Sequence, residues 1–197
     1  RRLIRPMKTG TASSDLQPRL NGLSIAHVTL HTSVSSVPQS LSLDSIAGKI
    51  RLMDDFLQRI QCNRRSIAVC ALNPHRGENG LFGDEEYRFI KPAVEACRAS
   101  GKSVVGPLPV DTLIRRAVSG EVDGVIAMYH DQGHIPMNLL AFENGVNVSI
   151  GLPISRTSVD HCTALDIAGT GRANEASLVA AIEVAVKMVH AQRQPSA

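Results

Sequence analysis

Three histidines occupy similar places in the sequence. His31, His75 and His130 each lie at, or shortly after, the carboxyl end of a segment that we predict to be a β-strand. In open α/β sheets ligands bind at the carboxyl edge, and neutral imidazole is the commonest side-chain ligand for zinc and similar divalent ions. Three such ligands leave an open coordination position for a substrate. Each histidine alone is more typical of a structural or surface residue, whereas their shared placement makes a divalent-metal site an equally good interpretation.

The residues that follow His130 offer a possible further ligand and a supporting carboxylate. His130 and His134 are four residues apart, a spacing that would put both on one face of a helix. Gly133 and Pro136 make a helix there unfavourable, so we do not expect His134 to be a ligand. Asp131 is either a carboxylate that supports a metal-bound histidine or the cap of the following segment.

Two isolated charged residues are further candidates. Asp111 is either a second supporting carboxylate or the N-cap of the helix after it. Arg156, within the sequence Ser-Arg-Thr-Ser, could bind an anionic substrate because a guanidinium matches phosphate or carboxylate in bidentate fashion. The chain has no GxGxxG after a strand and no GxxxxGK[ST], so a nucleotide would have to bind without a Rossmann fingerprint or a P-loop.

The elements that would position these side chains alternate along the chain. Short apolar runs favour buried strands, and the predicted strands are residues 23–30, 66–72, 104–105, 123–129 and 145–152. Between them, apolar residues recur at helical spacing behind capping residues. The predicted helices are residues 43–61 after Ser42, a helix between Glu86 and Gly101, a short helix capped by Asp111 that runs to about Ser119, and a last helix capped by Asn174. Strands that alternate with helices predict an α/β fold with a largely parallel sheet flanked by helices. The Gly-rich residues 73–83 read as a functional loop.

Composition narrows the class of protein. Hydrophobic residues make up 43% of the 197 residues, which is enough to fill a core, and the net charge is only +3. The basic residues are spread out and aromatic residues are few, so we expect no nucleic-acid partner. No stretch approaches the roughly 18 consecutive apolar residues of a membrane span. The four cysteines show no CxxC spacing, and we expect a cytoplasmic protein.

Four segments resemble the motifs of one family. Residues 72–83 (LNPHRGENGLFG) are similar to the LNPHAGEGGxxG signature of the 4-hydroxythreonine-4-phosphate dehydrogenase (PdxA) family. Residues 106–112 (GPLPVDT), 128–133 (MYHDQG) and 156–161 (RTSVDH) resemble further family motifs, in the same order and at plausible spacing. The resemblance extends from about Ile25 to Met188.

This resemblance implies roles for the residues at matching positions. His31, His75 and His130 correspond to the family's three metal-binding, catalytic histidines, in a site completed across a homodimer interface. Asn147 and Arg156 correspond to positions that bind the substrate, chiefly its phosphate.

A further segment resembles a cofactor loop. Residues 161–174 (HCTALDIAGTGRAN) are similar to the loop of isopropylmalate and isocitrate dehydrogenases that holds the adenosine part of the dinucleotide. The resemblance implies a fold of that type and NAD binding by this segment, and the implied residues are His161, Thr163, Asp166 and Asn174. A Gly-rich connector without a cofactor is the alternative.

The chain departs from the family pattern in three places. Asn138 stands where the family has a substrate-binding Lys, and Cys162 stands where the NAD loop usually has Gly. The family's N-terminal part is absent, so the resemblance covers about the last three-fifths of a family member. We expect residues 1–22, which match no motif, to be a flexible lead-in, and residues 23–197 to form the metal-binding, dimerisation and NAD-loop region.

The resemblance implies a specific reaction. It is the oxidation, dependent on NAD and a divalent ion (Zn, Mg, Mn or Co), of a secondary alcohol on a phosphorylated hydroxy acid of the 4-phosphooxy-L-threonine type, followed by decarboxylation, as in pyridoxine biosynthesis. One alternative is a cis-dihydrodiol dehydrogenase for an aromatic dicarboxylate, whose members share the HVTLH and HDQGHIP phrasing. Asn138 suits that alternative and Arg156 argues against it. The other alternative is a non-catalytic metal-binding dimerisation fragment.

Overall fold

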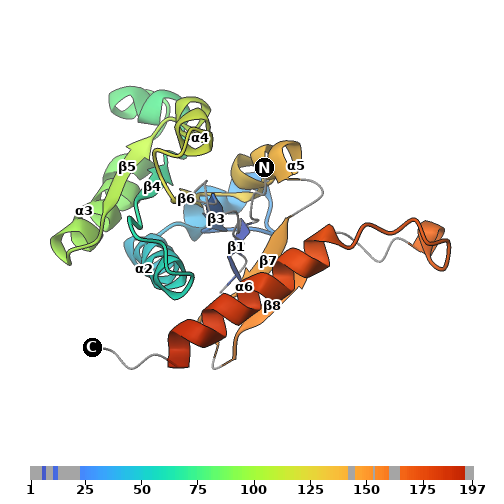
Figure 1. Ribbon diagram of the computed structural model, residues 1–197. Coiled ribbons are helices and arrows are strands. Elements are labelled where there is room, and N and C mark those ends of the chain that lie inside the picture. Colours follow the sequence, from blue (N-terminus) through green and yellow to red (C-terminus); the bar gives the residue numbers. More distant parts are fainter. Residues whose placement is uncertain are drawn as a thin grey trace.

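The computed structural model describes residues 6–7, 11–12, 23–141, 145–152, 154–159 and 165–193. Its largest element is a five-stranded sheet in which every pair of neighbouring strands is parallel (Figure 1). In spatial order the strands are β1 (Pro6–Met7), β3 (Ser24–His27), β6 (Gly124–Ala127), β4 (Ile67–Cys70) and β5 (Val104–Leu108). The predicted α/β class is therefore confirmed.

Helices cover both faces of this sheet, as Figure 1 shows. On one face lie α2 (Leu43–Arg59) and α3 (Lys91–Ala99), and on the other α4 (Val110–Val118) and α5 (His130–Ala141). Successive strand residues point to opposite faces, so Ala26 packs in the cluster with α2 and α3, while Ile25 packs in the cluster with α4 and α5. Burial on both faces explains why these strands read as short continuous apolar runs.

Two of the strand-to-helix connections contain short helical turns. The turn η1 (Val34–Ser36) and the helix α1 (Val37–Ser40) join β3 to α2. The loop after β4 contains η2 (Pro74–Gly80), and a π-helical turn, η3 (Glu86–Ile90), leads into α3. The single helix expected between Glu86 and Gly101 is thus divided between η3 and α3.

The start of α2 agrees with the prediction from sequence. Ser42 is its N-cap and accepts a hydrogen bond from the backbone N–H of Ser45, while the Ser45 hydroxyl accepts one from the Ser42 N–H. This reciprocal cap satisfies two backbone donors that a helix start leaves open.

A second, smaller sheet is antiparallel. It contains β2 (Thr11–Ala12), β7 (Val146–Ser149) and β8 (Arg156–Val159) in that order. The helix α6 (Ala176–Arg193) lies across β7 and β8 (Figure 1). Asn174 accepts a hydrogen bond from the backbone N–H of Ala176, which agrees with the predicted cap.

Two sequence-based expectations about helices were wrong. A helix does form over His130 and His134, with Pro136 inside it. Pro136 cannot donate to the Gln132 carbonyl, a loss that costs about 3 kcal/mol in an isolated helix, but α5 packs on the sheet and Gly133 allows a close approach there. Tertiary packing overrides local propensity.

The second correction concerns Asp111. The N-cap of α4 is Pro109, and Asp111 lies in the first turn, one residue after the helix begins. Asp111 is therefore not the cap. The preceding strand β5 also continues to Leu108, well beyond the two residues predicted.

No helix in the described ranges has the length and apolar character needed to cross a membrane.

Candidate functional site

The carboxyl edge of the large sheet brings two of the three predicted ligands together. Beyond the last paired residues, the Val28 N–H donates to the Ala127 carbonyl at 2.8 Å and the Thr29 N–H donates to the Met128 carbonyl at 3.1 Å. These hydrogen bonds keep the segments that follow β3 and β6 next to each other beyond the ends of the two strands. The ring centroids of His31 and His130, just after them, are 6.1 Å apart.

Asp131 contacts the ring of His130. Asp131 Oδ1 lies 2.8 Å from His130 Nδ1. A carboxylate can only accept, so the proton of a neutral imidazole lies on Nδ1 and the lone pair on Nε2 remains available to a ligand. Metal-bound histidines commonly donate their other ring N–H to a carboxylate. The contact favours the supporting-carboxylate interpretation of Asp131, although Asp131 also lies in the first turn of α5.

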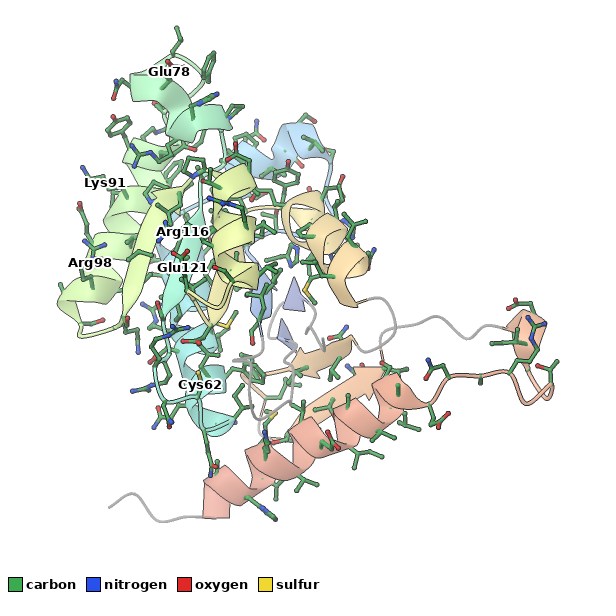
Figure 2. The ribbon with its side chains drawn as sticks, turned by 45° about the horizontal axis from the view of Figure 1, so that its top comes forward. Cys62, Glu78, Lys91, Arg98, Arg116 and Glu121 are labelled. Atoms are coloured by element: carbon green, nitrogen blue, oxygen red, sulfur yellow. The ribbon has the colours of Figure 1, made fainter. Side chains whose placement is uncertain are left out.

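His75 sits on a loop of unusual handedness. All five residues from His75 to Asn79 have positive φ, between 42° and 76°, and only Gly77 among them is a glycine. A non-glycine residue in this region is strained, and such strain persists where the surroundings hold it. A side chain at position 77 would bring its Cβ within 2.7 Å of the Gly83 carbonyl oxygen. Figure 2 shows Glu78 of this loop at the far end of the molecule from α6.

Glu86 fixes the base of the His75 loop. Its Oε1 accepts hydrogen bonds from the backbone N–H groups of Leu72 (2.9 Å) and Asn73 (2.8 Å), and its Oε2 accepts one from Asn73 Nδ2 at 3.0 Å. The Glu86 side chain is buried. A buried carboxylate with several N–H donors is well stabilised, so Glu86 supports the conformation of the segment that carries His75.

Two hollows meet at Tyr129 and Asp131. A cavity of about 600 Å³ is lined by the His75 loop, α4 and α5, and its polar lining residues are Asn73, His75, Asp111, Tyr129, Asp131 and Gln132. A hollow of about 470 Å³ is lined by His31 and His130, and also by Tyr129 and Asp131. Within the described part of this single chain, no three His, Cys, Asp or Glu side chains are close enough to hold a metal ion. The joint role of His31, His75 and His130 as ligands thus stays a prediction.

Gln132 connects the ends of two strands, a role that the sequence did not reveal. Its Oε1 accepts from the Met128 N–H and its Nε2 donates to the Ala71 carbonyl, both at 2.8 Å. The side chain is only 7% exposed. A buried amide with both ends satisfied fixes the segment after β6 against the segment after β4.

Sequence reasoning also missed two histidines beside His130. His27, the last residue of β3, is buried and its Nε2 lies 3.0 Å from the His130 carbonyl oxygen. His134 stacks on His130, with ring centroids 3.7 Å apart and planes 7° from parallel. The sequence signal for His134 is its four-residue spacing from His130, which places both rings on one face of α5.

The predicted substrate residues lie on other elements. Asn147 on β7 pairs with Ser158 on β8, and Ser149 pairs with Arg156. Asn147, Ser149 and Arg156 therefore share one face of the small sheet, while Val148 is buried beside α6 on the opposite face. Asn147 Oδ1 is buried and accepts no hydrogen bond from any described group.

Asn138 and the cofactor candidates complete the set. Asn138 is exposed on α5. Asp166 is exposed in the turn η4 (Leu165–Ile167), which Figure 1 shows well away from the large sheet, and the side chain of Asn174 caps α6. His161 and Thr163 lie outside the described residues.

Comparisons with known proteins identify the family. The family model "Pyridoxal phosphate biosynthetic protein PdxA" matches residues 8–185. A 4-hydroxythreonine-4-phosphate dehydrogenase from Desulfosudis oleivorans is 52% identical over 91% of this chain and 54% of its own length. A D-threonate 4-phosphate dehydrogenase from Pectobacterium atrosepticum is 47% identical over 84% of this chain and 51% of its own length. The chain spans about half the length of these curated relatives.

Solved structures agree. A 4-hydroxythreonine-4-phosphate dehydrogenase from Klebsiella pneumoniae superposes with a TM-score of 0.76 at 46% identity, over 91% of this chain and 54% of that one. A terephthalate 1,2-cis-dihydrodiol dehydrogenase from Burkholderia xenovorans gives 0.72 at 33% identity, over 90% and 55%. The resemblance seen in the four sequence motifs is confirmed, and the chain belongs to the pyridoxal phosphate biosynthetic protein PdxA family.

Proposed function

We propose that this chain is part of a dehydrogenase, dependent on NAD and a divalent metal ion, that oxidises a secondary alcohol on a small phosphorylated hydroxy acid of the 4-phosphooxy-L-threonine type, with decarboxylation of the product. One observation carries the proposal: His31 and His130 lie side by side at the carboxyl edge of the sheet, and Asp131 holds His130 Nδ1. The names of the relatives at 52% and 47% identity support a dehydrogenase for phosphorylated hydroxy acids.

The ligands fit a divalent ion. His31, His75 and His130 would supply neutral imidazole nitrogens, with the set completed across a homodimer interface as the resemblance implies. Because Asp131 accepts a hydrogen bond from the Nδ1–H of His130, the Nε2 lone pair is the one presented. When bound, the ion would act as a Lewis acid on the substrate hydroxyl and NAD⁺ would accept the hydride.

Residues of this chain would place the reacting groups. Gln132 fixes the segment that carries His130, and Glu86 fixes the segment that carries His75. Catalysis depends on reacting groups being held in a narrow range of positions, and buried hydrogen bonds of this kind limit motion. Both residues act through the ligands and need not touch the substrate.

The small sheet would bind the substrate's anionic group. The Arg156 side chain, exposed on the same face as Asn147, offers a guanidinium to a phosphate. Asn138 would replace the cation of the family's lysine with a neutral amide. The segment that contains His161, Thr163, Asp166 and Asn174 would hold NAD.

A cis-dihydrodiol of an aromatic dicarboxylate is the second candidate substrate. The neutral Asn138 favours it, and so does the TM-score of 0.72 with the terephthalate dihydrodiol dehydrogenase. The phosphorylated substrate ranks first because Arg156 is retained and because the 4-phosphate dehydrogenases share more identity, 52% and 47% against 33%.

NADH formation measured at 340 nm tests these candidates. A protein extended to the length of the relatives should be supplied with 4-phosphooxy-L-threonine, D-threonate 4-phosphate and the cis-dihydrodiol of terephthalate, each with and without a divalent ion. We expect metal-dependent reduction of NAD⁺ with a phosphorylated substrate. Turnover of the dihydrodiol alone would select the second candidate, and no turnover of any substrate would favour a non-catalytic role.

The 197-residue chain should be assayed beside the extended protein. Because the chain spans about half the length of its relatives and catalysis requires the reacting groups to be held in place, we expect the 197-residue chain alone to bind a divalent ion without reducing NAD⁺. Full activity of the shorter chain would contradict this expectation.

A further inference from the structure

His27 makes a hydrogen bond to the backbone of His130. It is 1% exposed, and its Nε2 lies 3.0 Å from the His130 carbonyl oxygen. A carbonyl can only accept, so Nε2 is the protonated nitrogen of His27. The Nε2–H of His27 therefore donates to the His130 carbonyl and ties the end of β3 to the backbone of His130.

The ring of His130 is held from two further directions. His134 stacks on it at 3.7 Å between centroids, and Asp131 accepts from its Nδ1. His134 in turn lies against His27, with centroids 4.9 Å apart. His27 therefore contacts the His130 backbone directly, and it also contacts the ring of His134, which stacks on the ring of His130.

Gly133 makes this arrangement possible. A Cβ at position 133 would lie 2.6 Å from His27 Cε1 and 2.8 Å from Ile25 Cγ2, and closer still to His27 Nε2. A real Cβ does not approach other atoms so closely, so only glycine lets α5 pack on the end of β3 here. His27 on β3 and Gly133 on α5 therefore pack directly against each other.

We propose that His27 is a positioning residue for His130: together with Gly133 it anchors the first residue of α5 to the end of β3 and so fixes where His130 Nε2 points. The inference rests on the proposed function in taking His130 as a metal ligand. Outer residues that orient a metal-bound histidine typically contribute about 10- to 100-fold to metal affinity. His27 is not expected to touch the ion or the substrate.

Metal affinity of two His27 variants tests the proposal. His27→Gln keeps an N–H donor near the position of Nε2, whereas His27→Leu fills the space without a donor. In Co²⁺ titrations of the extended protein, we expect His27→Gln to bind within roughly threefold of the unchanged protein and His27→Leu to bind about 10- to 100-fold more weakly. His190 is exposed on α6, so His190→Ala should leave the Co²⁺ affinity unchanged and serves as the control. Equal affinities for all variants, in a protein that does bind Co²⁺, would overturn the proposal and leave the proposed function intact.

A metal-free measurement separates this inference from the proposed function. Long-range ¹⁵N–¹H NMR spectra of the imidazoles report which ring nitrogen carries the proton. We expect the proton of His27 on Nε2 and that of His130 on Nδ1, and we expect His27→Leu to turn the single His130 tautomer into a mixture. A proton on His27 Nδ1, or an unchanged His130 tautomer in His27→Leu, would refute the positioning role even if no metal binds.

The pairing with Gly133 gives a further check. Gly133→Ala should weaken Co²⁺ binding strongly in the unchanged background and less in a His27→Ala background, where the clash with the imidazole ring is gone and only the contact with Ile25 Cγ2 remains. Residues in contact are not additive, whereas independent ones are. Strictly additive effects would show that the two residues act separately.

Discussion

Arg156 donates a hydrogen bond from Nη1 to the hydroxyl of Ser149, at 3.2 Å across the β7–β8 pair. This bond holds one terminal nitrogen of the guanidinium of an otherwise exposed side chain, on the face of the small sheet that also carries Asn147. The bond is part-buried, with Ser149 buried and Arg156 exposed, and a single hydrogen bond of this kind contributes only about 1 kcal/mol to the stability of a fold.

Arg156→Ala should therefore weaken substrate binding and leave the fold intact. Loss of one charge-assisted contact costs about 1.5–3 kcal/mol, which corresponds to a roughly 10- to 100-fold rise in KM. Steady-state kinetics and thermal melting of the extended protein measure both quantities, with Arg51→Ala on the exposed side of α2 as the control. An unchanged KM with a much lower melting temperature would mean that Arg156 is structural.

His75→Ala should lower the metal content of the protein and abolish turnover. A three-ligand site loses much of its affinity with each ligand, because the ion regains water in place of a fixed donor. Elemental analysis after dialysis measures the stoichiometry, and His190→Ala is the matched control. Full stoichiometry in His75→Ala would remove His75 from the proposed ligand set.

Gln132→Leu should destabilise the fold. The change leaves the Met128 N–H and the Ala71 carbonyl buried without their partner, and each unsatisfied group costs about 1–3 kcal/mol. Chemical denaturation should show a loss of about 2–5 kcal/mol. The exposed Gln58, changed to Leu in the same way, should shift stability by less than about 0.5 kcal/mol. Similar losses for both variants would rule out the strand-linking role of Gln132.

Lys49→Met should stabilise the protein at neutral pH. Burial lowers the pKa of Lys49 below its usual 10.5, so the fold penalises the charged form. The free-energy cost of burying the charged ammonium group is absent above pH 10.5, where Lys49 is neutral in both states. It increases as the pH falls below the pKa of the unfolded chain and reaches its full size below the lowered pKa of the folded protein. The gain from Lys49→Met should thus be largest near pH 7 and shrink toward pH 10.5 in melting experiments.

Lys102 provides the comparison for Lys49. Its Nζ lies 2.6 Å from Asp54 Oδ2, so Lys102→Met removes a paired charge and should not stabilise. If Lys49→Met were destabilising at pH 7, the ammonium group would be well solvated or paired, and the argument from burial would be wrong.

The sequence predicted best where one local signal decides the outcome. The start of α2 follows from Ser42 and the apolar stripe behind it, and the order of strands and helices follows from short apolar runs. The rule that ligands gather at carboxyl edges also placed His31 beside His130. These features depend on local chemistry and on general properties of parallel sheets.

The sequence predicted least well where distant contacts decide the outcome. The helix α5 forms despite Gly133 and Pro136 because that glycine fits against His27, more than a hundred residues earlier in the chain. The pairing of Asn73 with Glu86, which supports the His75 loop, is likewise invisible to a local pattern. The roles of His27 and Gln132 depend on which strands become neighbours, and sequence periodicity does not report that order.

The left-handed run from His75 to Asn79 changes what counts as a conservative substitution. On most exposed loops, polar residues of similar size exchange freely. Here the chirality of the backbone decides, so Asn or Gly fits at positions 76, 78 and 79 where Val, Ile or Thr does not, whatever their polarity. Variation at these surface positions would alter the shape of the loop that carries His75 without altering His75 itself.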